Sequence, residues 1–119
     1  MLDHIGIGAT NPQTSKAFYE AALEPLGIAV IKDFGSAVGF GSGGKPYFWI
    51  GKAESTTRAH VAFTAPDRKT VDTFYAAAIA AGGRDHGKPG IRAEYHPNYY
   101  GAFVLDPDGH NIEAVCHSG

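Results

Sequence analysis

An internal repeat constrains the fold of this chain more than any other feature of its sequence. When His4 is aligned with His60, a shift of 56 positions, matches continue through both copies. Asn11 aligns with Asp67, and both residue types cap helix N-termini well. A repeat of this length predicts a duplicated supersecondary unit, whose pairing can bring equivalent positions together. The other identical pairs are Ala9/Ala65, Thr14/Thr70, Phe18/Phe74, Tyr19/Tyr75, Ala21/Ala77, Ala22/Ala78 and Gly27/Gly83.

Length and composition indicate one small globular domain over residues 1–119. The net charge is −2 and the ten Lys and Arg are scattered, so we expect no nucleic-acid partner. Cys116 is the only cysteine, which excludes an internal disulfide and fits a reducing compartment. The sequence has no leader pattern and no apolar stretch long enough for a bilayer. We therefore expect a soluble, cytoplasmic protein without a membrane partner.

Each copy is predicted to form a strand, a helix and three further strands. In the first copy, residues 1–56, a helix capped by Asn11 follows strand 2–8 and precedes strands 28–34, 37–41 and 46–51. In the second copy, residues 57–119, a helix capped by Asp67 follows strand 59–65. A weak strand near Arg84, a loop over 87–98 and a hairpin of 99–105 with 110–117 complete it. The predicted fold class is α+β, with two tandem βαβββ modules.

The two repeated histidines are predicted to lie on corresponding faces of their strands. Successive side chains of a strand point to opposite faces. His4 therefore shares a face with Gly6, while His60 shares one with Ala62, and bulky apolar residues oppose them in both copies. The small residues beside each histidine leave room for a ligand. Alternatively, both are ordinary core histidines.

Glu113 is the third residue of the predicted site. In the last strand it points away from the apolar face formed by Ile112, Ala114 and Cys116. A buried carboxylate is costly unless it is paired or binds a cation, and solvent exposure is the alternative. Two imidazoles and one carboxylate bind catalytic zinc or non-haem iron(II) and leave coordination positions open. The sequence therefore predicts a divalent metal site of His4, His60 and Glu113, with no fourth ligand among residues 47–50.

The chain resembles the vicinal oxygen chelate superfamily, which includes glyoxalases, extradiol dioxygenases, fosfomycin-modifying enzymes, epimerases and bleomycin-resistance proteins. The resemblance rests on the repeat, on the two histidines and on the segment from Leu105 through His110 to Glu113. It implies paired modules curling into a half-open barrel around iron, zinc, manganese, nickel or cobalt. It also implies a homodimer, because short members often build each site across two chains. Whether His4 meets His60 within one chain or across a pair stays open.

Two functions follow from this resemblance. The first is a metal-dependent lyase, isomerase or dioxygenase acting on a small oxygen-chelating substrate, in which the cation is a Lewis acid. Glyoxalases usually have a fourth ligand where this chain has Phe48, Trp49 and Ile50, which disfavours glyoxalase activity. The alternative is a non-catalytic protein of the bleomycin-resistance type, which captures a small molecule without needing the three ligands.

Further candidates lie in the segment 87–100 and in the first module. Besides Glu113, we assign candidate catalytic roles in proton transfer or oxyanion stabilisation to His96, Tyr99 and Tyr100. Arg92 is a candidate for binding an anionic substrate group. The alternative for this segment is a surface loop whose aromatic residues pack over the barrel mouth. Trp49 and Phe48 are candidates for an apolar substrate pocket, with ordinary core packing as the alternative for both. His110 and His117 are plausible spare ligands, but His110 lies at the hairpin turn and His117 at the end of its strand, which disfavours both; Cys116 is expected to be buried.

Overall fold

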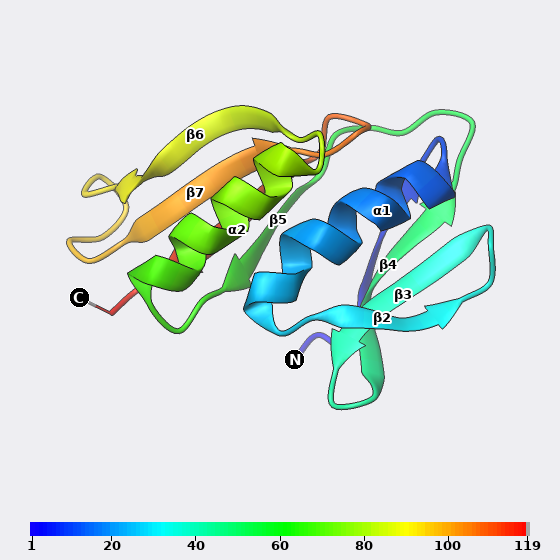
Figure 1. The fold of residues 1–119 in the computed structure, drawn as a ribbon, viewed down its shortest axis with the longest axis horizontal. Coiled ribbons are helices and arrows are strands. Elements are labelled where there is room, and N and C mark those ends of the chain that lie inside the picture. The colour runs from blue at the N-terminus through cyan, green and yellow to red at the C-terminus, as the bar shows by residue number, and fades with distance from the viewer. Residues whose placement is uncertain (119) are drawn as a thin grey trace.

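The computed structural model describes residues 1–118 and contains two four-stranded sheets, each with one long helix (Figure 1). The first module consists of β1 (Ile5–Ala9), α1 (Pro12–Leu23), the 3-10 turn η1 (Glu24–Leu26), β2 (Ala29–Asp33), β3 (Ala37–Ser42) and β4 (Lys45–Lys52). The second consists of β5 (His60–Thr64), α2 (Arg68–Ala80), β6 (Arg84–Ile91), β7 (Tyr100–Leu105) and β8 (Asn111–Cys116).

The two sheets have the same topology. Their strand orders are β1-β4-β3-β2 and β5-β8-β7-β6. In each sheet the first strand pairs in parallel with the last, and the remaining pairs are antiparallel. Neither sheet closes on itself. The predicted α+β fold of two tandem βαβββ modules is confirmed.

Repeated sequence produces repeated local structure at the helix starts. The Asn11 side chain accepts a hydrogen bond from the Thr14 amide at 3.2 Å, and the Asp67 side chain accepts one from the Thr70 amide at 2.8 Å. Each cap satisfies an amide that the first helical turn leaves without a partner. Both predicted N-caps are confirmed.

The predicted loop over residues 87–98 is wrong at its beginning, because β6 continues to Ile91. Gly87 pairs with Phe103 and Gly90 with Gly101, and the register shifts between these two pairs. Pro89 lies in this irregularity, where a ladder amide is not required. Pairing with β7 therefore holds a segment whose glycines and proline are typical of a loop.

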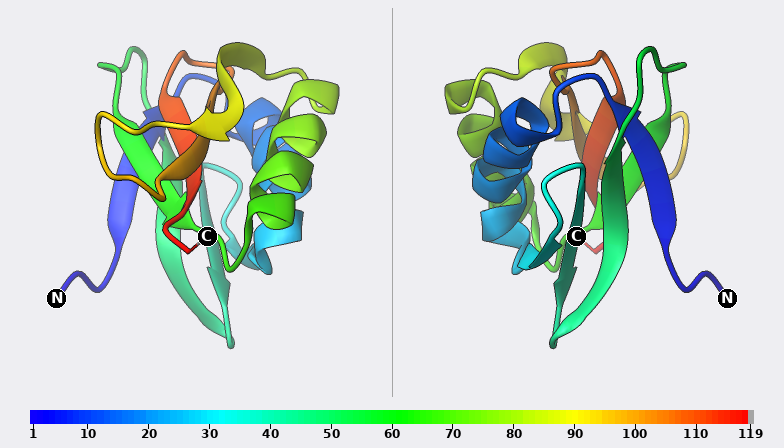
Figure 2. Two further views of the ribbon diagram at one scale, coloured as in Figure 1. Left: turned by 90° about the vertical axis from the view of Figure 1, so that its left-hand side faces the viewer. Right: turned by 90° about the vertical axis from the view of Figure 1, so that its right-hand side faces the viewer.

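Each sheet has an inner face, which packs toward the helices, and an opposite outer face. Inner-face residues of the first sheet are Val38, Phe40, Phe48 and Ile50, and those of the second are Val61, Phe63, Ala102, Val104, Ile112 and Ala114. They belong to one hydrophobic cluster, in which the rings of Phe48 and Phe63 lie 5.3 Å apart. Because the inner faces share a core, the outer faces point away from each other and no helix covers them (Figure 2).

Polar contacts also join the two modules. The His110 ring is fully buried, accepts a hydrogen bond from the Ala59 amide at Nδ1 and donates from Nε2 to the Gly8 carbonyl, both at 2.9 Å. The Tyr19 hydroxyl of α1 donates to Asp106 at 2.5 Å. His110 therefore joins the two modules, and both of its ring nitrogens contact backbone groups.

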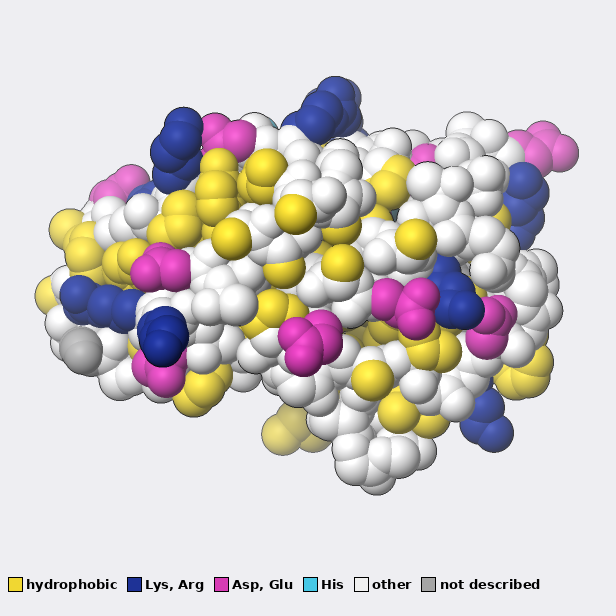
Figure 3. Space-filling model, viewed as in Figure 1, with side chains coloured by type: hydrophobic (Ala, Val, Ile, Leu, Met, Phe, Trp, Pro, Cys, Tyr) yellow, Lys and Arg dark blue, Asp and Glu magenta, His cyan; other side chains and the backbone are white. Residues whose placement is uncertain are grey.

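The helix-covered side has no concentration of one charge. Acidic and basic side chains are interspersed with hydrophobic ones on this side (Figure 3). This distribution agrees with the scattered Lys and Arg of the sequence. Within residues 1–118, every helix falls short of the length and apolarity that a membrane crossing requires.

We expect Tyr19→Phe to destabilise the protein more than Tyr47→Phe does. Loss of the Tyr19 hydroxyl leaves the buried Asp106 carboxylate short of one donor, which costs about 1–3 kcal/mol. The Tyr47 hydroxyl lies in an exposed contact with the Ser42 hydroxyl, so its removal by Tyr47→Phe serves as the matched control. Urea unfolding of both variants measures the difference, and equal losses would contradict the assigned role of Tyr19.

We also expect Tyr19 to make the stability of the protein decrease at alkaline pH. Burial, followed by the nearby Asp106 carboxylate, raises the pKa of Tyr19 well above its ordinary value. The folded state therefore favours the neutral phenol. This contribution is complete below about pH 10, where an unfolded tyrosine ionises, and is lost as the pH rises further. The free energy of unfolding should fall more steeply above pH 10 in the native protein than in Tyr19→Phe.

Candidate metal and substrate site

Glu113 is a buried carboxylate in the middle of β8. It lies on the outer face, because its neighbours Ile112 and Ala114 pack into the core, and it is only 1% exposed. A carboxylate in this position needs donors or a cation. The burial inferred for Glu113 from its strand position is therefore present in the structure.

His60 is the first partner of this carboxylate. Parallel pairing of β5 with β8 places Ala62 opposite Glu113, so that His60 Nε2 lies 2.9 Å from Glu113 Oε1. The imidazole is about half exposed, at 53%, and its ring centroid is 6.2 Å from that of Phe103. The structure thus brings together two of the three predicted metal ligands, 53 residues apart in the chain.

Tyr99 is the second partner of Glu113. Its hydroxyl donates to Oε2, the oxygen that His60 does not contact. A Cβ atom on Gly101 would lie 3.1 Å from the Tyr99 ring and 3.3 Å from this oxygen, so glycine leaves room for the pair. Burial, and then the hydrogen bond to Glu113, raises the pKa of Tyr99. The phenol is therefore a neutral donor at physiological pH.

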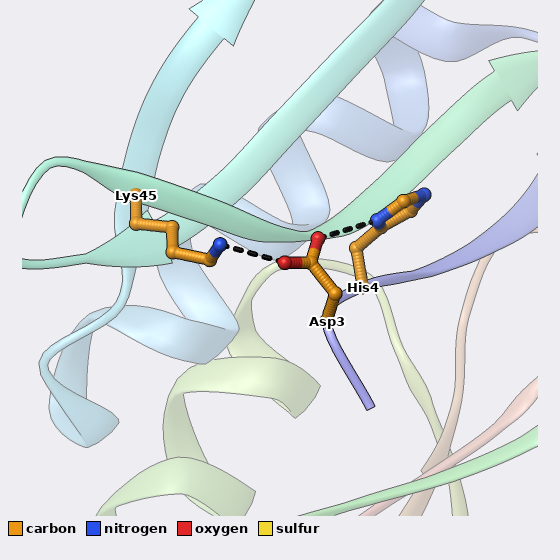
Figure 4. A network of polar contacts seen from close by, with 3 residues as sticks. All are labelled: Asp3, His4 and Lys45. Atoms are coloured by element: carbon orange, nitrogen blue, oxygen red, sulfur yellow. Dashed lines mark hydrogen bonds and ion pairs between the residues drawn. The ribbon is translucent and has the colours of Figure 1, made fainter. Parts of the chain in front are cut away.

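His4 does not join this group within one chain. It precedes β1, is exposed, and its Nδ1 lies 2.8 Å from Asp3, which also binds Lys45 Nζ at 2.8 Å (Figure 4). Chiefly through its hydrogen bond to Lys45, the pKa of Asp3 falls to about 2. Within the described residues 1–118, no three or more His, Cys, Asp or Glu residues are grouped so that they could hold a metal ion.

The two histidines nevertheless border the same hollow at the edges of β1 and β5. Its volume is about 590 Å³, and Leu2, Ile28, Val61 and Phe63 contribute to its apolar wall. The site side of each module is its outer face, however, and these faces diverge from the shared core (Figure 2). A site containing His4, His60 and Glu113 is therefore not assembled by a single chain.

The first module has a tryptophan at the position of Glu113. Gly6 pairs with Trp49 in the first sheet as Ala62 pairs with Glu113 in the second. The register thus makes Trp49 the equivalent of Glu113. Trp49 lies on the outer face, and its ring is parallel to that of Phe34, with the centroids 6.2 Å apart.

Two other candidates lie away from Glu113. Phe48 is fully buried and packs against Tyr19 and Phe63, so that it borders the hollow only as part of the core. Tyr100 lies on the inner face of β7 and donates to Asp72 of α2 at 2.6 Å. Tyr100, a candidate catalytic residue, is adjacent to Tyr99 in sequence but points to the opposite face, away from Glu113.

His96 is connected to Glu113 only through the rings of His117 and Tyr99. It is exposed, and its Nδ1 accepts a hydrogen bond from the Asn98 amide at 3.1 Å. Its ring lies 5.8 Å from that of His117, which in turn lies 5.2 Å from the ring of Tyr99. His96 and His117 are thus neighbours of the Tyr99 side of the site and do not contact Glu113 directly.

Arg92 lies on the outer face of the second sheet beside Phe103. Its guanidinium carbon is 5.4 Å from the Phe103 ring centroid, and Nη2 donates to the Lys88 carbonyl at 2.7 Å. Cβ atoms on Gly87 and Gly90 would each lie 3.1 Å from the guanidinium. The absence of side chains at both glycines therefore leaves room for this group. The structure therefore holds this cation in place on the same face as Glu113.

Sequence reasoning missed Phe103 and Asn111. Both line a hollow of about 310 Å³ together with Arg92, and Asn111 Oδ1 is buried without a hydrogen-bond partner among the described residues. The predicted hairpin of residues 99–105 with 110–117 already implied that Phe103 pairs with Glu113, as it does in the structure. Extending strand parity across that hairpin would have found Phe103.

Comparison with known proteins identifies the family. A model of the Glyoxalase/Bleomycin resistance protein/Dioxygenase superfamily matches residues 1–114. The chain therefore belongs to this superfamily, as the sequence motifs indicated. No curated protein sequence matches the chain.

Similar solved structures cover nearly the whole chain. A glyoxalase/bleomycin resistance protein from Albidiferax ferrireducens is 29% identical over 99% of both chains, with a TM-score of 0.83. A lactoylglutathione lyase from Agrobacterium tumefaciens is 20% identical over 98% of this chain and 92% of its own, with a TM-score of 0.71. The protein named oxidase ChaP-H2 is 22% identical over 99% and 94% of the two chains, with a TM-score of 0.68. The latter two show a shared fold.

We expect Tyr99→Phe to lower stability, because Glu113 Oε2 would be left buried without its donor. The expected loss is about 1–3 kcal/mol in the free energy of unfolding. Tyr95→Phe is the matched control, since the Tyr95 side chain is 63% exposed. Urea unfolding in metal-free buffer measures both, and a larger loss in Tyr95→Phe would contradict this account of Glu113.

Proposed function

We propose that this protein is a metal-dependent enzyme that acts on a small substrate offering two oxygens to a divalent cation. The observation that carries the proposal is the contact between His60 Nε2 and the buried Glu113 Oε1. A neutral imidazole and a carboxylate are ligands for zinc and for iron(II). When bound, the cation would supply Lewis-acid stabilisation of negative charge on the substrate.

The surroundings of Glu113 fit a cation. Its two described side-chain donors, His60 and Tyr99, are groups that can remain neutral, so the buried carboxylate has no permanent positive partner among these contacts. A divalent ion facing His60 Nε2 and Glu113 Oε1 would satisfy both atoms. Tyr99 would continue to hold Oε2. His4, His60 and Glu113 are the residues that would bind this ion.

We propose that His4 comes from a second copy of the chain, in a homodimer. The divergence of the outer faces supports this assembly, because His4 is not grouped with His60 and Glu113 among the described residues of one chain. Apolar groups near the edge of β1 support this assembly, because Leu2 is 81% exposed and Ile5 is 38% exposed. In a twofold dimer the same contact forms twice and gives two equivalent sites.

Other residues of this chain would bind and orient the substrate. The guanidinium of Arg92 would bind an anionic substrate group. Phe103, beside it, would contact the apolar part of the same substrate. Tyr99 would fix the Glu113 carboxylate rather than move a proton itself, because its pKa is raised. Similar structures bear the names of a lyase and an oxidase, and a shared fold does not choose between such reactions.

A non-catalytic small-molecule binder is the second candidate. It is favoured by the aromatic surface of Trp49 and Phe34 and does not need the three ligands. Calorimetric titration of a candidate ligand into metal-stripped and metal-loaded protein separates the two functions, since metal-independent affinity favours the binder. For either function we propose the cytoplasm as the location, because the buried free Cys116 fits a reducing compartment.

We expect Glu113→Gln to lower the metal content of the purified protein at least about tenfold. The amide keeps the shape of the side chain but loses the anionic ligand, while Tyr99 can still contact it. Glu20→Gln is the control, because Glu20 is an exposed residue on α1. Elemental analysis of protein purified without added metal gives the readout. Unchanged metal content in Glu113→Gln would end the enzyme proposal.

A mixed dimer tests whether the site is shared between chains. His4→Ala chains retain His60 and Glu113, whereas Glu113→Gln chains retain His4. If sites form across chains, a heterodimer purified through two tags should recover one intact site, about half the metal of the native dimer. Each variant alone should bind much less. A heterodimer that binds no more metal than the two variants alone would exclude a shared site.

A further inference from the structure

The outer face of the first sheet carries a tryptophan between two glycines. The register places Gly6, Trp49 and Gly39 side by side on β1, β4 and β3. The corresponding positions of the second sheet are Ala62, Glu113 and Phe103. The first module therefore has an indole, and room around it, where the second has its buried carboxylate.

Gly39 is required by the position of this indole. A Cβ atom at Gly39 would lie 2.8–2.9 Å from three carbons of the six-membered ring, closer than side chains can approach. The ring thus lies directly over the backbone of β3. Glycine inside a strand often marks such a close approach. Phe34 lies parallel to the indole, with 4° between the ring planes, and is 67% exposed.

On its other side, Trp49 borders an open hollow next to His4. The hollow has a volume of about 610 Å³ and is lined by Asp3, His4, Gly6, Lys45, Pro46 and Trp49. A Cβ on Gly6 would approach nothing closer than 3.9 Å, so there is space above this glycine. Trp49 and His4 both line this hollow; the Trp49 atoms nearest to Gly6 are Cβ and the carbonyl oxygen, and the six-membered ring extends over Gly39.

The charges around the hollow are already paired. Lys45 Nζ and His4 Nδ1 both contact the Asp3 carboxylate, which lies between them (Figure 4). Recognition in this hollow therefore depends on the aromatic wall more than on an unpaired charge. Aromatic rings add binding energy beyond buried area when they meet another π-system in an offset or edge arrangement.

We infer that Trp49 selects a substrate with a flat, conjugated ring system, which enters the hollow beside Gly6 and packs against the neighbouring indole. This inference rests on the proposed function for its position beside the metal-binding histidine, and it names the substrate class of that site. The stacked pair of Trp49 and Phe34 is also a surface that a second copy of the chain could cover. That occupant is an alternative outcome of the experiment below.

The sole tryptophan gives a direct test by NMR. Its indole N–H should produce one resonance in metal-free, isotope-labelled protein. The probes are 2-naphthol and its saturated counterpart decahydro-2-naphthol, which share a carbon skeleton and hydroxyl but differ in planarity. We expect 2-naphthol to shift this resonance saturably and the saturated alcohol to bind at least about threefold more weakly. Equal binding of both probes, or binding without an indole shift, would overturn the inference.

Two glycine substitutions provide matched variants. Gly39→Ala should displace the indole and weaken 2-naphthol binding about three- to tenfold, while the protein remains folded. Gly51→Ala, also in a strand of this sheet, should leave binding unchanged because its Cβ would meet nothing within 4 Å. Unaltered binding in folded Gly39→Ala would contradict the inference.

Trp49→Leu provides a second variant, which removes the indole directly. The test then does not depend on whether Gly39→Ala folds. Calorimetry should show the same loss of 2-naphthol affinity in this variant, and sedimentation should show an unchanged oligomeric state. Loss of dimer with unchanged affinity would instead assign Trp49 to the contact between copies and overturn the inference. If 2-naphthol binds as expected but no metal is found, the aromatic site stands and the proposed enzyme function fails. If metal binds but the probes do not differ, only this inference fails.

Discussion

The hydrophobic core shared by the two inner faces determines how the rest of this molecule is arranged. Phe48 of the first sheet packs against Phe63 of the second, and both helices pack in the same cluster. Burial of such apolar surface is the main favourable contribution to folding. Because this core occupies the space between the sheets, their outer faces point in opposite directions. Among the described residues, His4 is accordingly not grouped with His60 and Glu113.

The duplicated modules are similar in fold and different in chemistry. Strand order and helix caps repeat, yet at one equivalent position the second module has Glu113 and the first has Trp49. A buried carboxylate requires donors, which His60 and Tyr99 supply, whereas an indole requires space, which Gly39 supplies. Each module has thus adapted the neighbours of one position to a different side chain. In the proposed dimer these two chemistries would lie on opposite walls of one site.

Much of the fold was predictable from the helix-cap residues and from the repeat. The Asn11 and Asp67 caps, and the 56-residue shift of the repeat, identified the helices and the order of elements. Strand parity placed Glu113 opposite the apolar side of its strand, and it is buried there. The extent of β6 was missed because pairing with β7, and not local propensity, holds Gly87 and Gly90 in the sheet. Strand parity separates Tyr99 from Tyr100, and the pairing of β7 with β8 shows that Tyr99 is the one that faces Glu113.

The sequence by itself determined the family, the repeated βαβββ order and the side chains available for metal binding. These features depend on residue types and on their spacing along the chain, and the sequence contains both in full. Only the tertiary structure decided that His60 and Glu113 come within 2.9 Å while His4 lies on another face. It also decided that Gly87, Gly90 and Gly39 make room for Arg92 and Trp49. Such contacts join residues far apart in sequence, and packing between elements sets their geometry.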